Sequence, residues 1–278
     1  MFSIRRHMLI MLNIVCLIIS VGLISAECFC FQAPVSPPSV INVEVEPQIV
    51  VPEIPPLILE INKVNSLVTS FSCDHISIQT WYKGLRTKSQ GELYYEPENK
   101  FRFFAQSVMG EECDMGSNDN FFWFWSKRMK EPGLFYARYE DFHKTRLKTP
   151  LNPMWLRSSL GLDPIDLKNA NISETPKEYI IIQPTLNSIG DRVFAYTIVD
   201  KSNKCIRGFS LLNSSNEVIA SVEITRSKGT IDKILYSWNE EDRTMQMNFQ
   251  SPSFNHAIDR KFWDMPINHS PKIDMGKD

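Results

Sequence analysis

The feature that most constrains the fold is a run of five consecutive aromatic residues, positions 121–125, within a series of short strand-like segments. Aromatic and β-branched residues favour strands because they pack well on a pleated surface, whereas Gly, Pro, Asn and Asp favour turns. The expected strands of this group are residues 76–85, 91–95, 100–108, 111–115, 121–125 and 134–139. Polar turns separate them, so the group predicts an antiparallel meander.

A second group of strand-like segments follows towards the C-terminus. Its expected strands are residues 179–184, 192–200, 204–212, 218–226, 231–238 and 243–249. Apolar residues at three- and four-residue spacing predict two amphipathic helices, over residues 57–69 and 152–160. We expect the apolar stripe of the first helix to be buried against the sheet.

The N-terminal residues have the order of a secretory signal. Arg5 and Arg6 precede an uncharged apolar run, residues 8–24, which small residues close. The run is close to the roughly 20 residues that span a bilayer, so an uncleaved anchor is the alternative, and lipidation of Cys28 or Cys30 is a weaker one. We expect a signal peptide or anchor over 1–26, a proline-rich linker over 27–56, one domain over 57–266 and a disordered tail over 267–278. The chain is then exported, to the periplasm or cell envelope.

Composition and spacing disfavour several classes of function. The net charge is −2 and charges of both signs are interspersed, which is unlike a nucleic-acid-binding protein. The histidines are scattered and no Gly-x-Ser-x-Gly motif occurs, so no catalytic triad is expected. Cys73, Asp74 and His75 are adjacent, and neighbouring side chains of an extended chain point in opposite directions, so we expect no metal site there. Cys73, Cys113 and Cys205 could supply one disulfide in an exported chain or stay as buried thiols.

The aromatic region carries more apolar bulk than one face of a sheet needs. Its side chains either fill an ordinary core or line a concave cavity that holds an apolar ligand such as an acyl chain. Strand alternation predicts which residues face inward, and a shift of one residue would invert each assignment. The expected lipid-binding residues are Leu93, Tyr95, Phe101, Phe103, Phe122, Phe124 and Leu235, with Trp155 and Leu160 on a lid.

Several short motifs follow one another in a recognisable order. They are the helix end 67–71, the segments 91–97 and 100–103, the turn 116–120 before the aromatic strand, the strand start 229–231 and the closing segment 259–266. In this order they resemble the LolA/LolB-type lipoprotein-carrier superfamily, including exported, planctomycete-like members. The resemblance covers residues 57–266.

The resemblance implies an α+β fold: a half-open, strongly curved antiparallel β-sheet, or incomplete barrel, with helices covering the concave face. It also implies non-covalent carriage or reception of lipid or lipid-modified protein, with no cofactor. One position departs from soluble LolA-type carriers, which place an Arg before the Pro of the second strand where this chain has Glu96. With the apolar N-terminus and proline-rich spacer, this departure favours a tethered receptor, lipid transporter or envelope sensor over a shuttling carrier.

The sequence therefore predicts an exported, membrane-associated, non-enzymatic monomer that binds the acyl chains of lipid or lipoprotein and no nucleic acid. The alternative is a protein-interaction or stress-sensing domain of the same fold, whose groove is filled by its own side chains. Lipid that co-purifies with the protein would distinguish the first function from the second.

Overall fold

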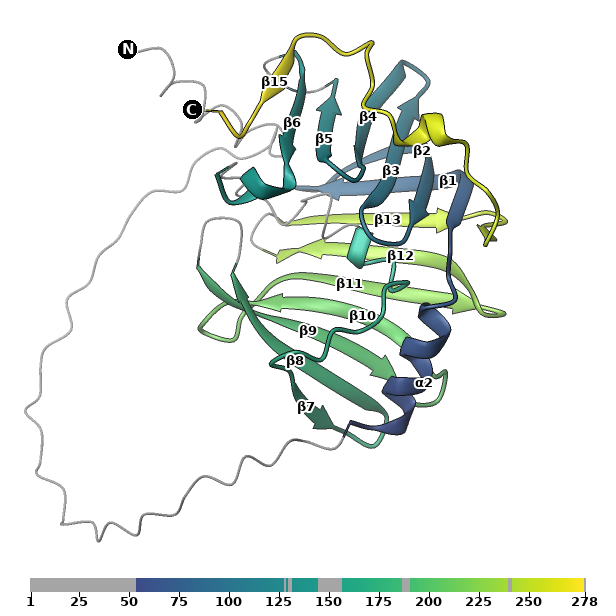
Figure 1. The fold of residues 1–278 in the computed structure, drawn as a ribbon, viewed down its shortest axis with the longest axis vertical. Coiled ribbons are helices and arrows are strands. Elements are labelled where there is room, and N and C mark those ends of the chain that lie inside the picture. The colour runs from purple at the N-terminus through teal and green to yellow at the C-terminus, as the bar shows by residue number, and fades with distance from the viewer. Residues whose placement is uncertain are drawn as a thin grey trace, which may run out of the picture.

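One large sheet dominates the computed structural model, which describes residues 54–127, 129, 132–144, 157–186, 191–239 and 242–277 (Figure 1). The first group of strands is β1 (Phe71–Tyr82), β2 (Leu85–Glu96), β3 (Lys100–Ser107), β4 (Gly110–Ser117), β5 (Phe121–Ser126) and β6 (Leu134–Arg138). The second is β7 (Asn171–Glu174), β8 (Glu178–Leu186), β9 (Arg192–Asp200), β10 (Cys205–Leu212), β11 (Val218–Ser227), β12 (Thr230–Trp238) and β13 (Arg243–Phe249). The expected signal segment 1–26 and most of the linker lie outside the described residues.

The two groups of strands join through the first and last of them. Strand β1 pairs with β2 on one side and with β13 on the other, so the sheet runs β15-β6-β5-β4-β3-β2-β1-β13-β12-β11-β10-β9-β8-β7. Neighbouring strands are antiparallel except β6 and β15 (Lys272–Asp274). Strand β14 (Ser253–Phe254) pairs with β1 off this path. The expected half-open antiparallel sheet is confirmed, as one open, curved sheet and not a closed barrel.

The helix α2 (Pro56–Asn65) lies against the ends of the second group of strands (Figure 1). Ile58 and Ile61 are buried in the core, so one face of the helix packs as expected. Three other predicted apolar positions are not covered, because Leu59, Val64 and Leu67 are 53%, 58% and 65% exposed. Leu57 and Val68 are partly buried against the core. The helix also ends earlier than residue 69, since the chain leaves the helix at Ser66. The expectation of a fully buried stripe is therefore wrong.

The other helical segments are short. The 3₁₀ helices η1 (Tyr139–Lys144) and η3 (Arg260–Trp263) have six and four residues. Most of the helix expected over residues 152–160, including Trp155, falls outside the described residues. In the part of the chain that the structure describes, no helix combines the length and the apolar character that a bilayer span requires.

The C-terminal residues are ordered where the sequence predicts a disordered tail. Residues 272–274 form β15, in parallel register with residues 134–136 of β6. Before this strand, Trp125 stacks on His269, with ring centroids 3.9 Å apart. This expectation is wrong at these residues. A strand of three residues can add to an existing sheet edge, and polar composition alone does not predict such a pairing.

Gly208 on β10 leaves no room for a side chain. A Cβ built on it would overlap the main-chain oxygen of Val222 on β11, which cannot move without disturbing the ladder. We therefore expect Gly208→Ala to lower the free energy of unfolding by about 1–3 kcal/mol, measured by urea denaturation. Ser210→Ala on the same strand is the control and should change it by less than about 0.5 kcal/mol. Equal midpoints for the two variants would contradict this packing.

Candidate functional site

The inner face of the sheet contains an open cavity of about 540 Å³. Its walls come from β1 to β5 and from β12 and β13. The apolar wall residues are Ile78, Leu85, Leu93, Phe101, Phe103, Ala105, Met115, Phe124, Tyr236, Trp238, Met245 and Met247. A cavity of this volume falls within the range of ligand sites, roughly 300–1,000 Å³, and its apolar wall suits an apolar ligand.

Strand register places the first half of this wall. Leu93 of β2 lies opposite Phe103 of β3, Phe103 lies opposite Met115 of β4, and Met115 lies opposite Phe124 of β5. Directly opposed residues in antiparallel strands share one face, so these four side chains form a continuous row. This row forms a continuous apolar part of the cavity wall.

The second half of the wall comes from the junction between β1 and β13. Ile78 lies opposite Met247, Thr80 lies opposite Met245, and Met245 in turn lies opposite Tyr236 of β12. Methionine side chains are flexible and fit irregular apolar shapes, so this part of the wall can adapt its shape. The cavity therefore spans the junction of the two strand groups.

Polar groups gather at the end of the cavity where β1 and β13 meet their turns. Tyr82 and Arg243 are opposed across the ladder, and the guanidinium lies 5.2 Å from the centre of the tyrosine ring. The hydroxyl oxygen of Tyr82 is buried without a hydrogen-bond partner in the described structure. Lys88 and Glu112 also contribute to the wall. Most of the cavity wall is thus apolar and one end is more polar. This arrangement is complementary to an amphipathic ligand, which has an apolar part and a polar part.

Four of the predicted site residues line this cavity: Leu93, Phe101, Phe103 and Phe124. Three others are in the core beside it. Tyr95 and Phe122 are 1% and 0% exposed, and Leu160 is fully buried. Their burial agrees with an inward orientation, but the cavity wall does not include them.

Tyr95 is held by a polar cluster under the loop that carries Leu160. Its hydroxyl donates to the Asp163 carboxylate at 2.7 Å, and Arg157 pairs with the same carboxylate at 2.9 Å. Burial, more than the nearby Asp163 charge, raises the pKa of Tyr95 above its ordinary value. The hydroxyl therefore stays protonated and acts as a donor that fixes the loop to the sheet.

Leu235 lies on the wrong face of β12. Ile234, Tyr236 and Trp238 are buried on the face that contributes to the cavity wall, while Leu235 is only partly buried and faces away from the cavity. Alternation counted from Ile231 predicts Leu235 as inward, but the register against β11 shifts between Ile231 and Lys233. Such a bulge adds one residue and inverts the alternation after it.

Sequence reasoning missed the contribution of β1 and β13 to the cavity, and on β12 it selected Leu235 instead of Tyr236 and Trp238. Ile76, Ile78 and Tyr82 are buried at near-alternate positions of β1, and Met247 and Phe249 are buried on β13. The alternation was therefore present in the sequence. The pairing of β1 with β13, which lies about 170 positions away, is what brings these residues to one face.

The described residues contain no assembly suited to metal binding. No group of three His, Cys, Asp or Glu side chains in the described ranges could hold a metal ion. Cys73, Cys113 and Cys205 are free thiols on β1, β4 and β10. Burial raises the pKa of Cys73 and of Cys205, which keeps both thiols protonated at neutral pH.

Comparison with known proteins shows a likeness in fold. No protein-family profile matches the chain, and comparison with curated proteins gives no match. A DUF1329 family protein from Desulfovibrio piger is similar at a TM-score of 0.51 with 8% identity, over 75% of this chain and 95% of that chain. A domain from Vibrio parahaemolyticus, described as an outer membrane lipoprotein-sorting protein, has a TM-score of 0.51 with 8% identity, over 74% and 94% of the two chains. The chain has the fold of these proteins.

A LolA superfamily protein from Nitrosomonas europaea also matches, with a TM-score of 0.49 and 8% identity, over 76% of this chain and 96% of that one. The DUF1329 and lipoprotein-sorting structures confirm the resemblance in fold that the sequence motifs predict. At 8% identity the likeness concerns the fold alone. Any argument about the function of this chain must therefore start from its own cavity.

Proposed function

We propose that this chain is an exported, membrane-associated monomer that binds the acyl chain of a lipid or lipoprotein at the cell envelope and catalyses no reaction. The observation that carries the proposal is the apolar cavity of about 540 Å³ on the inner face of the sheet. The lipoprotein-sorting domain with the same fold supports a carrier or receptor function. The apolar N-terminal run supports export and attachment to a membrane.

The size of the cavity favours one long acyl chain. A methylene group is about as large as a water molecule, which takes up about 30 Å³ in the liquid. A volume of about 540 Å³ then holds roughly eighteen such groups. A groove filled by the side chains of the described residues would leave no such space, so the cavity favours ligand binding over the self-filled interaction domain.

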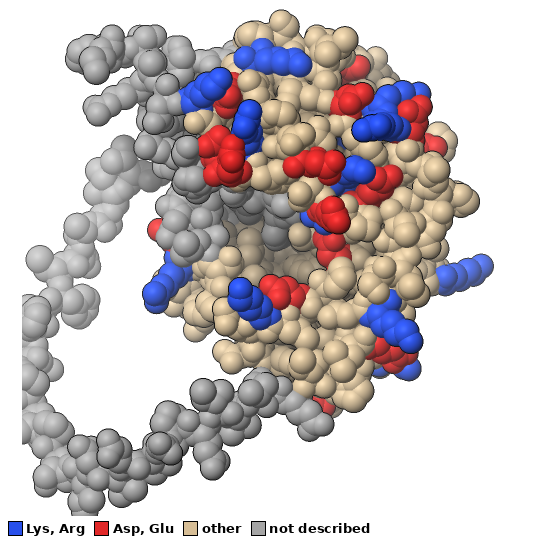
Figure 2. All heavy atoms as spheres, in the orientation of Figure 1, with Lys and Arg blue, Asp and Glu red and all other residues tan. Residues whose placement is uncertain are grey.

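The distribution of surface charge is consistent with a ligand that binds mainly through apolar contacts. Figure 2 shows acidic and basic side chains interspersed over the face in view, without a broad area of one sign. Long-range attraction of a strongly charged macromolecule needs such an area. Burial of the acyl chain is therefore the main source of affinity in the proposed function, at about 0.8 kcal/mol for each methylene group.

Native mass spectrometry of the purified chain, followed by organic extraction, tests the proposal. We expect the mass of the protein plus one lipid or acylated peptide, and release of that ligand into the organic phase. A protein that carries no ligand, and whose mass is unchanged after incubation with lipids and lipopeptides, would exclude acyl-chain binding and favour the interaction domain.

A further inference from the structure

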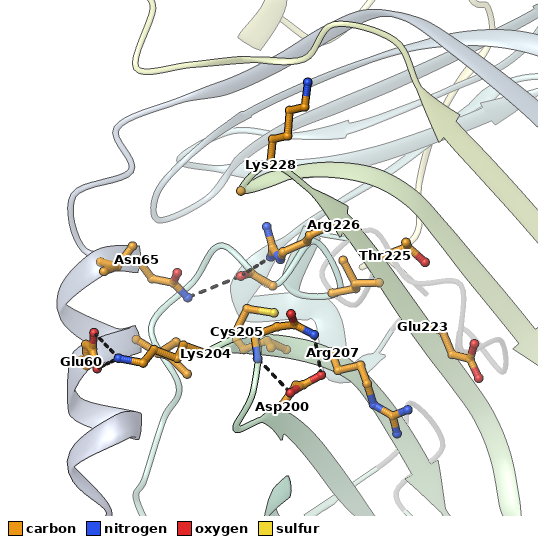
Figure 3. A pocket seen from close by; sticks show the side chains of 17 residues that line it. Glu60, Asn65, Asp200, Lys204, Cys205, Arg207, Glu223, Thr225, Arg226 and Lys228 are labelled. Carbon is orange, nitrogen blue, oxygen red and sulfur yellow. Dashed lines mark hydrogen bonds and ion pairs between the residues drawn. The ribbon is translucent and has the colours of Figure 1, made fainter. Parts of the chain in front are cut away.

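A second pocket, of about 600 Å³, lies between α2 and the ends of β9, β10 and β11 (Figure 3). Unlike the apolar cavity, its wall contains many charged side chains. They are Glu60, Asp200, Lys204, Arg207, Glu223, Arg226 and Lys228. None of these residues belongs to the apolar cavity, so the two sites are separate.

Four of these seven charged side chains already have partners. Lys204 lies 3.5 Å from Glu60 of α2, and Arg207 lies 2.8 Å from Glu178 of β8. The Asp200 carboxylate accepts hydrogen bonds from the main-chain N–H groups of the turn that follows it, which lowers its pKa. These groups need no ligand to balance their charge.

Arg226 differs because no carboxylate of the described structure balances its charge. Its Nη2 atom donates to the main-chain oxygens of Leu160, at 3.4 Å, and Gly161, at 3.2 Å. Its Nε atom is buried without a partner. Burial lowers the pKa of Arg226, with the Cys205 thiol as the nearby polar group. Carbonyl groups and a protonated thiol satisfy hydrogen bonds but leave the positive charge uncompensated, which is unfavourable away from water.

Figure 3 shows how Arg226 is held beside the pocket. Arg226 from β11 and Asn65 from α2 approach the same carbonyl oxygen, that of Gly161, and Asn65 also donates to the main-chain oxygen of Asp163 at 2.9 Å. Helix, loop and strand thus fix the guanidinium at the pocket wall. Lys228 extends from the turn after β11, is exposed, and belongs to the same wall. The end of β11 therefore presents two cationic side chains, one fixed and one free to reorient.

We propose that this pocket binds a phosphate group, with Arg226 and Lys228 supplying the balancing positive charge. A phosphate carries up to two negative charges, which matches two cations, and arginine and lysine are the usual protein ligands of phosphate. The group comes either from free phosphate or from the headgroup of a phospholipid. This site does not depend on acyl-chain binding in the apolar cavity.

Thermal unfolding of the full chain, with and without inorganic phosphate at constant ionic strength, tests the site. At about one hundred times its Kd, phosphate should raise Tm by about 5–10 °C for a chain of this size. Arg226→Gln should remove this shift, and Lys228→Gln should weaken binding about tenfold. Arg207→Gln is the matched control, because Arg207 lines the same pocket but is paired with Glu178, and it should keep the full shift.

Vesicles of phosphatidylglycerol distinguish the two sources of the phosphate. Binding to vesicles that Arg226→Gln weakens and Arg207→Gln preserves, without a shift from inorganic phosphate, would identify the lipid headgroup as the ligand. Should Arg226→Gln fail to fold, Arg226→Lys and Lys228→Gln carry the comparison. The proposal is overturned if neither probe binds the wild-type chain, or if binding is the same in the variants at positions 226 and 228 as in Arg207→Gln.

Discussion

Replacing Phe103 by Asp is expected to abolish acyl-chain binding. Phe103 lies at the centre of the apolar row, opposite Leu93 and Met115, and is 6% exposed. An ionised carboxylate at this position would have to lose its water of hydration when an acyl chain enters. We expect binding to weaken at least about a hundredfold, which corresponds to a cost of about 3 kcal/mol. Native mass spectrometry after incubation with lipid measures the bound fraction.

The matched control for this substitution is Phe121→Asp. Phe121 lies on β5 but belongs to the opposite face, where its ring contacts Tyr136 and the Arg138 guanidinium. The same loss of a phenyl group and the same added charge should leave lipid binding unchanged. Since Phe103→Asp removes a buried ring, circular dichroism must show that the variant is folded; Phe124→Asp, at a partly buried wall position, provides a second test. A folded Phe103→Asp protein that still binds lipid would contradict the cavity assignment.

Local sequence patterns were sufficient to predict most strands. Turn residues and alternation place β3, β5, β9 and β12 within a few residues of their observed ends. The clearest differences are in β1 and β2, which begin at Phe71 and Leu85 and not at residues 76 and 91. The early part of β1 contains a bulge, because its register against β2 shifts between Cys73 and Ile76. The bulge places Asp74 and His75 together on exposed positions, which breaks the apolar alternation that marks a strand.

Half of the cavity wall was predictable from the same local patterns of alternation and turn residues. Leu93, Phe101, Phe103 and Phe124 come from consecutive hairpins, in which each strand pairs with the next one in sequence. The other half depends on the pairing of β1 with β13, and local patterns do not state which distant strands will meet. The inversion at Leu235 shows the second limit, because a single bulge moves every later residue of a strand to the other face.

The second pocket had no signal in the sequence. Arg226 is an ordinary basic residue at the end of an alternating strand, and its distinctive property is the absence of a carboxylate partner in the described structure. That property depends on the loop at Leu160 and Gly161, which lies 65 residues away in sequence. A missing ion pair is a feature of the tertiary structure, so only the structure could show it.

Replacing Asp114 by Asn is expected to cause a large loss of stability. Asp114 of β4 is 3% exposed at its side chain and pairs with Arg102 of β3 at 2.7 Å. Arg102 also donates to the main-chain oxygen of Phe262 at 3.3 Å, so this ion pair fastens η3 to the outer face of the sheet. Removing one partner leaves Arg102 without its counter-charge in a mostly buried place. We expect the free energy of unfolding to fall by about 3 kcal/mol in urea denaturation.

The control is Glu140→Gln, which breaks the pair between Arg138 and Glu140. Those side chains are 62% and 72% exposed, so water replaces the lost contact and the expected change is about 0.5 kcal/mol or less. Hydrogen exchange adds a readout that identifies the cause, because Asp114→Asn should also speed exchange in residues 260–274 relative to β9 and β10. Equal stability of the two variants, or unchanged exchange in that segment, would mean that the stacking of Phe262 on Tyr94 holds the C-terminal segment without the ion pair.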